Sequence, residues 1–144
     1  MNKIKDTLSK LKGKGYRFSA IRNFILVTLS ENDKPLSVSD LQKKIKGKEM
    51  SANKTTLYRE LNFLKKEGIV LEVQLNDNKR WYEPADRHHH HHIICSKCNK
   101  IEDFIGCDYK KLINKALNQA PSFAQITNHN FDFLGLCKSC AKNQ

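Results

Sequence analysis

The chain has 144 residues, which is enough for one ordinary domain or two small ones. Its 26 lysines and arginines outnumber its 15 aspartates and glutamates, and the resulting formal net charge of +11 predicts an anionic partner such as nucleic acid; a basic protein with no such partner is the alternative. No apolar run approaches the roughly 20 residues that span a bilayer, and the lysine-rich start lacks a signal-peptide core, so we expect a cytoplasmic protein with reduced thiols and no membrane partner.

The first half of the chain predicts a series of helices. Ser19 is a possible N-cap for a helix that continues to about residue 29. Ser37 and Asp40 match a capping box at the start of a second helix. Apolar residues recur at helical spacing in both segments: Phe18, Ile21, Ile25 and Leu29 in the first, and Val38, Leu41 and Ile45 in the second.

A third helix, over residues 53–66, precedes a pair of strands. Leu57, Leu61 and Leu64 form its apolar stripe, and Gly68 supplies the C-terminal stop. Residues 69–83 then read as two extended runs around the polar turn Asn-Asp-Asn at 76–78, which predicts a β-hairpin. Helices followed by a hairpin indicate a winged helix-turn-helix, with residues 53–66 as its recognition helix.

The polar face of this third helix predicts contacts with DNA. Tyr58 and Arg59 are placed to reach phosphates or base edges in the major groove, and arginine prefers guanine. Lys54, Thr55 and Thr56 are placed for contacts with the phosphate backbone. The alternative is that Tyr58 packs between helices and that Arg59 is a solvated surface charge.

The cysteines and histidines all follow residue 83, whereas 18 of the 26 lysines and arginines precede it. Two Cys-x-x-Cys pairs have the spacing of a closed, tetrahedral structural zinc site, formed by Cys95, Cys98, Cys137 and Cys140. Such a site has no open position for a catalytic water. Cys107 is left over, and we interpret it as a small buried residue, with a role as a metal ligand as the alternative.

Five consecutive histidines, from His88 to His92, lead directly into the first cysteine pair. If the run enters a strand, alternation places His88, His90 and His92 on one face and His89 and His91 on the other, so that one strand can supply two metal sites. Glu83, Glu102 and Asp103 offer carboxylates nearby, and His129 is the only histidine outside the run. Sites of mixed nitrogen and oxygen ligands suit Zn, Fe(II) or Mn(II).

The sequence resembles the ferric uptake regulator (Fur) superfamily over nearly its whole length. The resemblance lies in "GYRFSAIR", "TTLYRELNFLKKEGIV", "RWYEPADRHHHHHIICSKCNKIEDF" and "ITNHNFDFLGLCKSC". It implies an α+β protein, with a winged-helix DNA-binding domain at residues 1–83 and a small α/β dimerisation domain with the four-cysteine zinc at residues 84–144. It also implies a homodimer, not an enzyme, that represses transcription from operator DNA when a regulatory metal is bound.

The resemblance also implies two further metal sites. The family's regulatory site, near the hinge between the domains, falls on Glu83, His90, His92 and Asp103. The family's second site, inside the dimerisation domain, falls on His89, His91 and His129. The usual acid of this second site is replaced by Lys110, with Asp108 close by.

Two departures from the family pattern bear on the type of regulator. Many iron and peroxide sensors of the family take a regulatory histidine from the DNA-binding half, where this chain has Pro35 and no histidine before His88. A four-coordinate zinc site needs no such ligand, so the pattern favours the zinc uptake regulator branch, although the cysteine that several zinc sensors use near the hinge is absent. The alternatives are an iron- or manganese-responsive regulator, or a histidine-rich protein that stores or delivers metal. A hydrolytic metalloenzyme is a further alternative, but the sequence contains no recognisable catalytic motif of that class.

Overall fold

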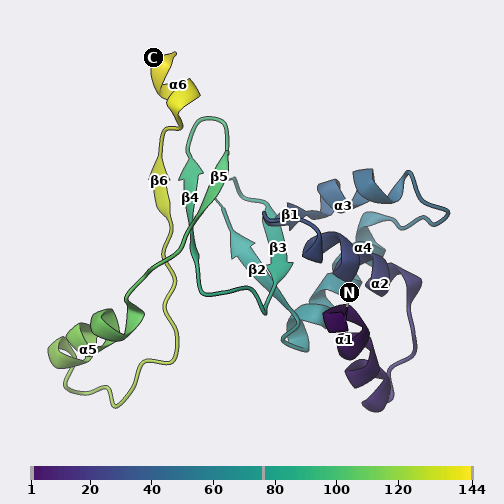
Figure 1. The fold of residues 1–144 in the computed structure, drawn as a ribbon, viewed down its shortest axis with the longest axis horizontal. Coiled ribbons are helices and arrows are strands. Elements are labelled where there is room, and N and C mark those ends of the chain that lie inside the picture. The colour runs from purple at the N-terminus through teal and green to yellow at the C-terminus, as the bar shows by residue number, and fades with distance from the viewer. Residues whose placement is uncertain (1, 76, 144) are drawn as a thin grey trace. The chain divides into compact units, whose positions relative to one another are not determined.

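The computed structural model describes residues 2–75 and 77–143, which fold into two compact units (Figure 1). The first unit is Met1–Asp86 and the second is Arg87–Gln144, so the division falls three residues beyond position 83. Each unit contains its own three-stranded sheet. Among the described residues, no helix is long and apolar enough to cross a lipid bilayer.

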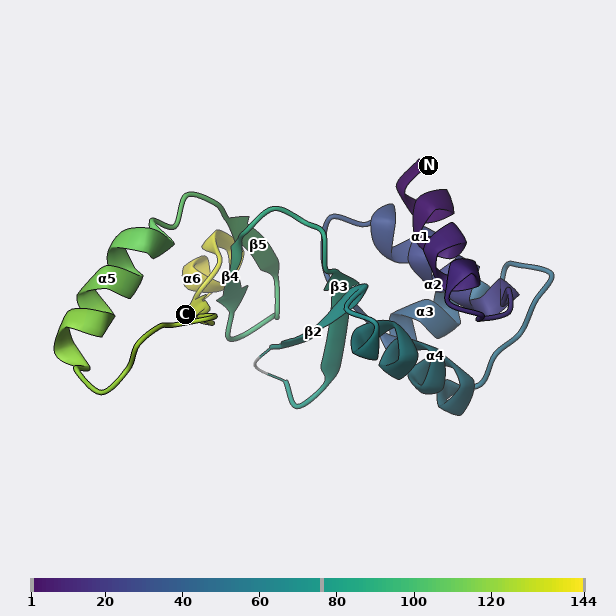
Figure 2. The same cartoon turned by 90° about the horizontal axis from the view of Figure 1, so that it is seen from below.

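The first unit packs four helices beside a small antiparallel sheet. The helices are α1 (Asn2–Gly13), α2 (Ala20–Ser30), α3 (Val38–Ile45) and α4 (Lys54–Lys66). The strands are β1 (Leu36–Ser37), β2 (Val70–Gln74) and β3 (Arg80–Pro84), in the order β1-β3-β2. Figure 2 shows the helices gathered together, with the β2–β3 hairpin following α4. This arrangement is the expected winged helix-turn-helix.

Local hydrogen bonds begin the helices at the predicted residues. Ser19 Oγ accepts a hydrogen bond from the backbone N–H of Arg22 at 3.2 Å, which caps α2. Ser37 Oγ accepts from the Asp40 N–H at 3.2 Å, and the Asp40 carboxylate accepts from the Ser37 N–H at 2.9 Å, so the capping box of α3 is complete. After α4, Gly68 has a φ of +72°, a left-handed conformation that glycine adopts without steric cost.

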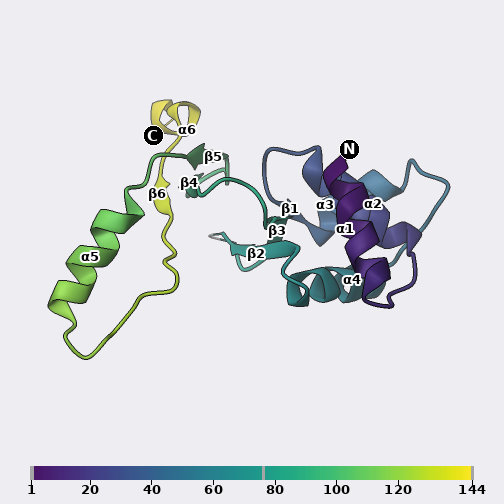
Figure 3. The same cartoon turned by 60° about the horizontal axis from the view of Figure 1, so that its bottom comes forward.

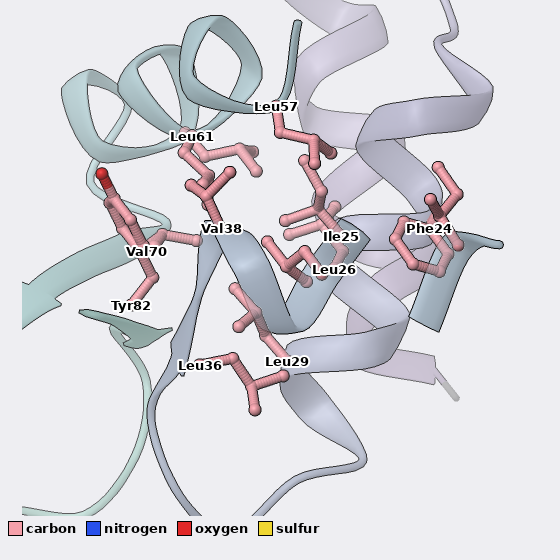
Figure 4. Packing of buried hydrophobic residues seen from close by; sticks show 13 residues of the cluster. Phe24, Ile25, Leu26, Leu29, Leu36, Val38, Leu57, Leu61, Val70 and Tyr82 are labelled. Atoms are coloured by element: carbon pink, nitrogen blue, oxygen red, sulfur yellow. The ribbon is translucent and has the colours of Figure 1, made fainter. Parts of the chain in front are cut away.

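The core of the first unit forms where the helices meet the sheet (Figure 4). Leu57, Leu61 and Leu64 are fully buried, as their predicted stripe requires. Val70 and Tyr82 close the core from the hairpin. The apolar stripe of α4 therefore fixes this helix against the unit, which leaves its opposite face to the solvent.

Two features of the first unit differ from the sequence patterns. Helix α1 was not predicted, although Ile4 and Leu8 pack against the core and Leu11 is buried at the spacing of one helical face. Phe18 was expected on the apolar face of α2, but its side chain is 73% exposed. The reason is its position: Phe18 precedes the N-cap Ser19 and so lies outside the helix whose face it seemed to extend.

The wing is the β2–β3 hairpin, which pairs Val73 with Trp81 in antiparallel register. In its turn, Trp81 Nε1 donates a hydrogen bond to Asp77 Oδ1 at 2.9 Å, and Asn78 takes a left-handed φ of +53° that asparagine tolerates. Asn76, the first residue of the predicted turn, lies outside the described residues.

The second unit is built on a sheet whose central strand continues from the histidine run. Strand β4 (His91–Cys95) pairs antiparallel with β5 (Ile101–Phe104) and parallel with β6 (Phe133–Gly135). Helix α5 (Tyr109–Gln119) lies between β5 and β6 in the chain, and α6 (Lys138–Lys142) follows β6. Helix α5 has no buried residue, and Figure 3 shows it standing away from the three strands.

Candidate metal centres and DNA interface

The histidine run separates into two pairs of neighbouring rings. Only His91 and His92 belong to β4, and residues 88–90 precede the strand. The ring centroids of His90 and His92 lie 5.0 Å apart, and those of His89 and His91 lie 4.8 Å apart. The alternate residues therefore pair as a strand would pair them, although three of the five histidines lie outside β4.

The four cysteines of the two Cys-x-x-Cys pairs come together because β6 lies parallel to β4. The register places Gly135 beside Cys95, and Gly135 O accepts a hydrogen bond from the Ser96 N–H at 2.9 Å. Cys137, two residues later, is thereby brought to the end of β4, where its sulfur lies 3.7 Å from that of Cys98. All four sulfurs lie within 4.8 Å of one another, and a tetrahedral zinc–thiolate site separates its sulfurs by about 3.8 Å.

Backbone N–H groups favour deprotonated sulfur at Cys95 and Cys137, whereas a side-chain hydrogen bond with Cys137 raises the pKa of Cys140 to about 12. The pKa of Cys95 is lowered to about 6, chiefly by a hydrogen bond from the Cys137 N–H, whose nitrogen lies 3.4 Å from the Cys95 sulfur. The pKa of Cys137 is also lowered, first by the N–H of Cys140. Asn99 has a left-handed φ of +61° and donates its N–H to the Cys95 carbonyl at 2.9 Å, which closes the turn between the first two sulfurs. The donor set fits a structural zinc.

Hydrogen bonds orient the rings of His90 and His92. His90 Nδ1–H donates to the His88 carbonyl, with the two atoms 2.6 Å apart, so that Nε2 carries the lone pair. His92 Nδ1 lies 3.3 Å from Asp132 Oδ1, which also accepts a hydrogen bond from the His92 backbone N–H at 3.2 Å. Asp132 is 40 residues from His92 in the chain, and no local pattern in the sequence pointed to it.

The two carboxylates predicted beside these histidines have different environments. The β4–β5 register places Asp103 directly opposite His92. The Asp103 carboxylate forms an ion pair with Arg87, with Nη2 and Oδ2 2.5 Å apart and both side chains less than a quarter exposed. Glu83 belongs to β3 of the first unit, where it pairs with Leu71. Within the second unit, the rings of His90 and His92 are thus neighbours, and Asp103 lies opposite His92 with its carboxylate held by Arg87. Among the described residues, Asp103 belongs to no cluster of potential metal-ligand atoms.

The other histidine pair belongs to a second cluster. His89, His91 and His129 converge, and Cys107 joins them; one ligand atom from each lies within 4.8 Å of the others. The pKa of His91 is lowered, first by burial and then by His89 and His129, so its neutral, ligating form is favoured. Cys107 was interpreted as a small buried residue, with a role as a metal ligand as the alternative; its side chain is half-buried and contacts this group. Its distance from the histidines along the chain hid the relation.

Neither Lys110 nor Asp108 supplies an acidic ligand to the second cluster. Lys110 is exposed on α5. Asp108 is the N-cap of α5, where its carboxylate accepts a hydrogen bond from the Lys111 N–H at 3.2 Å. Neither residue belongs to the cluster among the described residues.

The predicted DNA-contacting residues lie in the first two turns of α4. Asn53 caps the helix by accepting a hydrogen bond from the Thr56 N–H at 2.8 Å. Lys54, Thr55 and Arg59 are exposed, and Thr56 is half-buried. Tyr58 is also half-buried and packs against the core, so at least part of its ring has the structural role that was left open.

Comparisons with known proteins agree with this architecture. Residues 13–133 match the profile of the ferric uptake regulator family. The ferric uptake regulation protein of Helicobacter pylori is 28% identical over 134 residues, which cover 93% of this chain and 88% of that protein. The peroxide-responsive repressor PerR of Staphylococcus epidermidis is 27% identical, covering 96% and 91%. A solved structure of the Helicobacter pylori Fur, described as revealing three functional metal binding sites, superimposes with a TM-score of 0.83 at 28% identity, covering 97% and 93%.

Proposed function

This chain belongs to the ferric uptake regulator family, and we propose that it is a zinc-responsive repressor of zinc uptake that acts in the cytoplasm. Members of this family are metal-responsive transcription regulators, not enzymes. The observation that carries the choice of zinc is the absence of any histidine before His88 in the sequence. The ligands of a regulatory site must therefore come from Glu83, the histidine run and nearby carboxylates. Four such ligands complete a tetrahedral zinc site.

The proposed regulatory ligands are Glu83, His90, His92 and Asp103. Support comes from the neighbouring rings of His90 and His92 and from Asp103 opposite His92 in the sheet. A bound zinc would supply one bridge between nitrogen and oxygen donors. Arg87 holds Asp103 in an ion pair, so this arginine must release the carboxylate before it can serve as a ligand.

Glu83 is the reason that this site can act as a switch. It belongs to the first unit, whereas His90 and His92 belong to the second. Ligands from both units favour one relative orientation of the two recognition helices in a dimer, which must be about 34 Å apart to enter successive major grooves. The gain in DNA affinity cannot exceed the ratio of the metal affinities of the two conformations. Such couplings are typically about 5–150-fold, and DNA tightens metal binding by the same factor.

The proposed dimer would cover the apolar surface that the second unit exposes. Large apolar side chains of this unit are exposed by 40–70%, on its strands, on α5 and in the adjoining loops. They include Ile93, Ile105, Tyr109, Leu112, Phe133 and Leu134. Exposed apolar side chains in this number favour a protein–protein interface. A zinc held by Cys95, Cys98, Cys137 and Cys140 would tie α6 to the same sheet and so support this surface.

The experiment that tests the proposal measures operator binding at buffered free metal concentrations. Operator DNA is selected from a random duplex pool with the zinc-loaded protein, and affinity is then followed by fluorescence anisotropy with Zn, Fe(II) under anaerobic conditions, or Mn(II). We expect zinc to tighten binding at the lowest free concentration. Tightening by Fe(II) or Mn(II) but not by zinc would assign an iron- or manganese-responsive regulator. Tight metal binding with no effect on any duplex would assign metal storage or delivery.

Two matched double variants separate the regulatory histidines from their neighbours. His90→Ala with His92→Ala should abolish metal-dependent operator binding while the four-cysteine zinc and the dimer remain, because neither residue belongs to that cluster. His89→Ala with His91→Ala removes the same number of imidazoles from the same run. It should lower metal content or thermal stability more than it changes the operator response. Equal behaviour of the two variants would contradict the assignment.

A further inference from the structure

Cys107 is the one cysteine of the chain outside the two Cys-x-x-Cys pairs, and it lies in the loop between β5 and α5. Its sulfur is 3.9 Å from Nε2 of His129, which precedes β6. That same Nε2 is 3.2 Å from Nε2 of His91, at the start of β4. Three separate segments therefore bring a thiol and imidazoles to one point.

The spacing of these atoms is that of a metal site. Zinc binds imidazole nitrogen at about 2.0–2.1 Å and thiolate at about 2.3 Å, so a tetrahedral site separates its ligand atoms by about 3.3–3.6 Å. The separations in the structure, 3.2 Å between the two nitrogens and 3.9 Å between nitrogen and sulfur, lie on either side of this range. His89 provides the fourth atom, and all four lie within 4.8 Å of one another. We propose that Cys107 completes a second zinc site with His89, His91 and His129.

The surrounding rings hold these ligands in place. The His91 ring stacks on Phe131 with centroids 3.8 Å apart and planes at 20°. The His129 ring lies parallel to that of Tyr109, with centroids 5.9 Å apart and planes at 14°. His91 is only 4% exposed. Aromatic neighbours that fix the ring planes lower the conformational entropy that metal binding must remove, so the site is largely preformed.

A thiol that merely packs among histidines is the simpler reading, and it leaves one feature unexplained. A single hydrogen bond between Cys107 and His129 would account for the 3.9 Å separation, but it would not gather three imidazoles. Among the described residues, no aspartate or glutamate belongs to this group of ligand atoms. The thiolate of Cys107 supplies the only negative charge of the ligand set.

This ligand set makes a chemical prediction that three histidines alone do not make. A thiolate is a soft ligand, so a site of three nitrogens and one sulfur favours zinc over Mn(II) and Fe(II). All four ligands belong to the second unit, which makes this site a support of that unit and not part of the hinge. The inference therefore stands apart from the proposed zinc-dependent control of operator binding.

The test compares the full-length protein with its Cys107→Ser variant after the loosely bound metal is removed and Co(II) is added. The four-cysteine site keeps its zinc, which elemental analysis verifies. We expect wild type to bind Co(II) with a sulfur-to-cobalt charge-transfer band in the near ultraviolet. In Cys107→Ser that band should be lost, and zinc affinity at this site should fall by roughly tenfold or more.

Two further variants keep the test decisive. Cys107→Asp restores an anionic ligand, so it should bind zinc or cobalt without the charge-transfer band, even if Cys107→Ser folds poorly. Lys110→Ala, on the exposed start of α5, should match wild type. A serine variant that keeps the band and the zinc affinity would overturn the inference. Operator binding is read in the same samples: its failure with an intact cobalt spectrum counts against the proposed function alone.

Discussion

Asp132→Asn is expected to weaken zinc binding at the proposed regulatory site without removing a ligand. Oδ1 of Asp132 lies 3.3 Å from His92 Nδ1 and accepts the His92 backbone N–H at 3.2 Å. The carboxylate therefore keeps the Nδ1 proton in place, directs the lone pair to Nε2 and makes that nitrogen more basic. Asparagine keeps an oxygen that can accept the backbone N–H, so the substitution removes mainly the negative charge.

The size of the effect follows from the burial of the pair. Loss of a carboxylate that orients a metal-bound histidine typically lowers metal affinity about 10–100-fold, or about 1.4–2.7 kcal/mol. The His92 side chain is 6% exposed, but that of Asp132 is 20% exposed, so water partly screens the carboxylate. We therefore expect the lower part of this range, roughly 10–30-fold.

The assay is a zinc competition titration against a chelating dye of known affinity, paired with the free zinc concentration that half-saturates operator binding. Both midpoints should move by the same factor, because the metal and DNA equilibria are linked. Glu102→Gln is the matched control, since it removes one charge from the same sheet at a side chain that is 67% exposed. A shift of less than about twofold in Asp132→Asn, or an equal shift in the control, would refute the reasoning.

Other substitutions test the remaining parts of the structure. Arg59→Ala should weaken operator binding with unchanged metal content. A loss of about 1–3 kcal/mol confined to one base position indicates a guanine contact, and a uniform loss with a smaller salt dependence indicates a phosphate contact. No change in affinity would indicate that Arg59 is a solvated surface residue that does not contact DNA. Cys140→Ser should remove one zinc per protomer and dissociate or unfold the dimer, so a zinc-free dimer seen by sedimentation would contradict the structural role. Leu61→Ala should lower the free energy of unfolding by about 2–5 kcal/mol in chemical denaturation, because this fully buried side chain leaves a cavity. The pKa of Glu67 is lowered from 4.5, chiefly by a hydrogen bond from Lys14. The contribution of Glu67 to stability is therefore complete above pH 4.5 and is lost as the pH falls through the lowered pKa. Glu67→Gln should make the melting temperature depend less steeply on pH in this acid range.

The sequence by itself determined the features that depend on near neighbours in the chain. The capping box of Ser37 and Asp40, the helix stop at Gly68 and the leucine stripe of α4 each rest on residues within a few positions of one another. The paired cysteines likewise carry their spacing in the sequence. Local periodicity also misled at one point, because Phe18 continued the apolar pattern of α2 past the residue that caps it.

Only the tertiary structure decided how the metal ligands are combined. The parallel pairing of β6 with β4 joins segments about 40 residues apart, and no periodicity within either strand encodes that partner or its register. This pairing brings Cys137 to the end of β4, and it lies next to the contact of Asp132 with His92. The separate approach of Cys107 to His129 depends on the path of the loop between β5 and α5. The residues that can bind metal could therefore be identified from the sequence. Their assignment to separate sites required strand pairing and loop paths that form only when distant segments pack together.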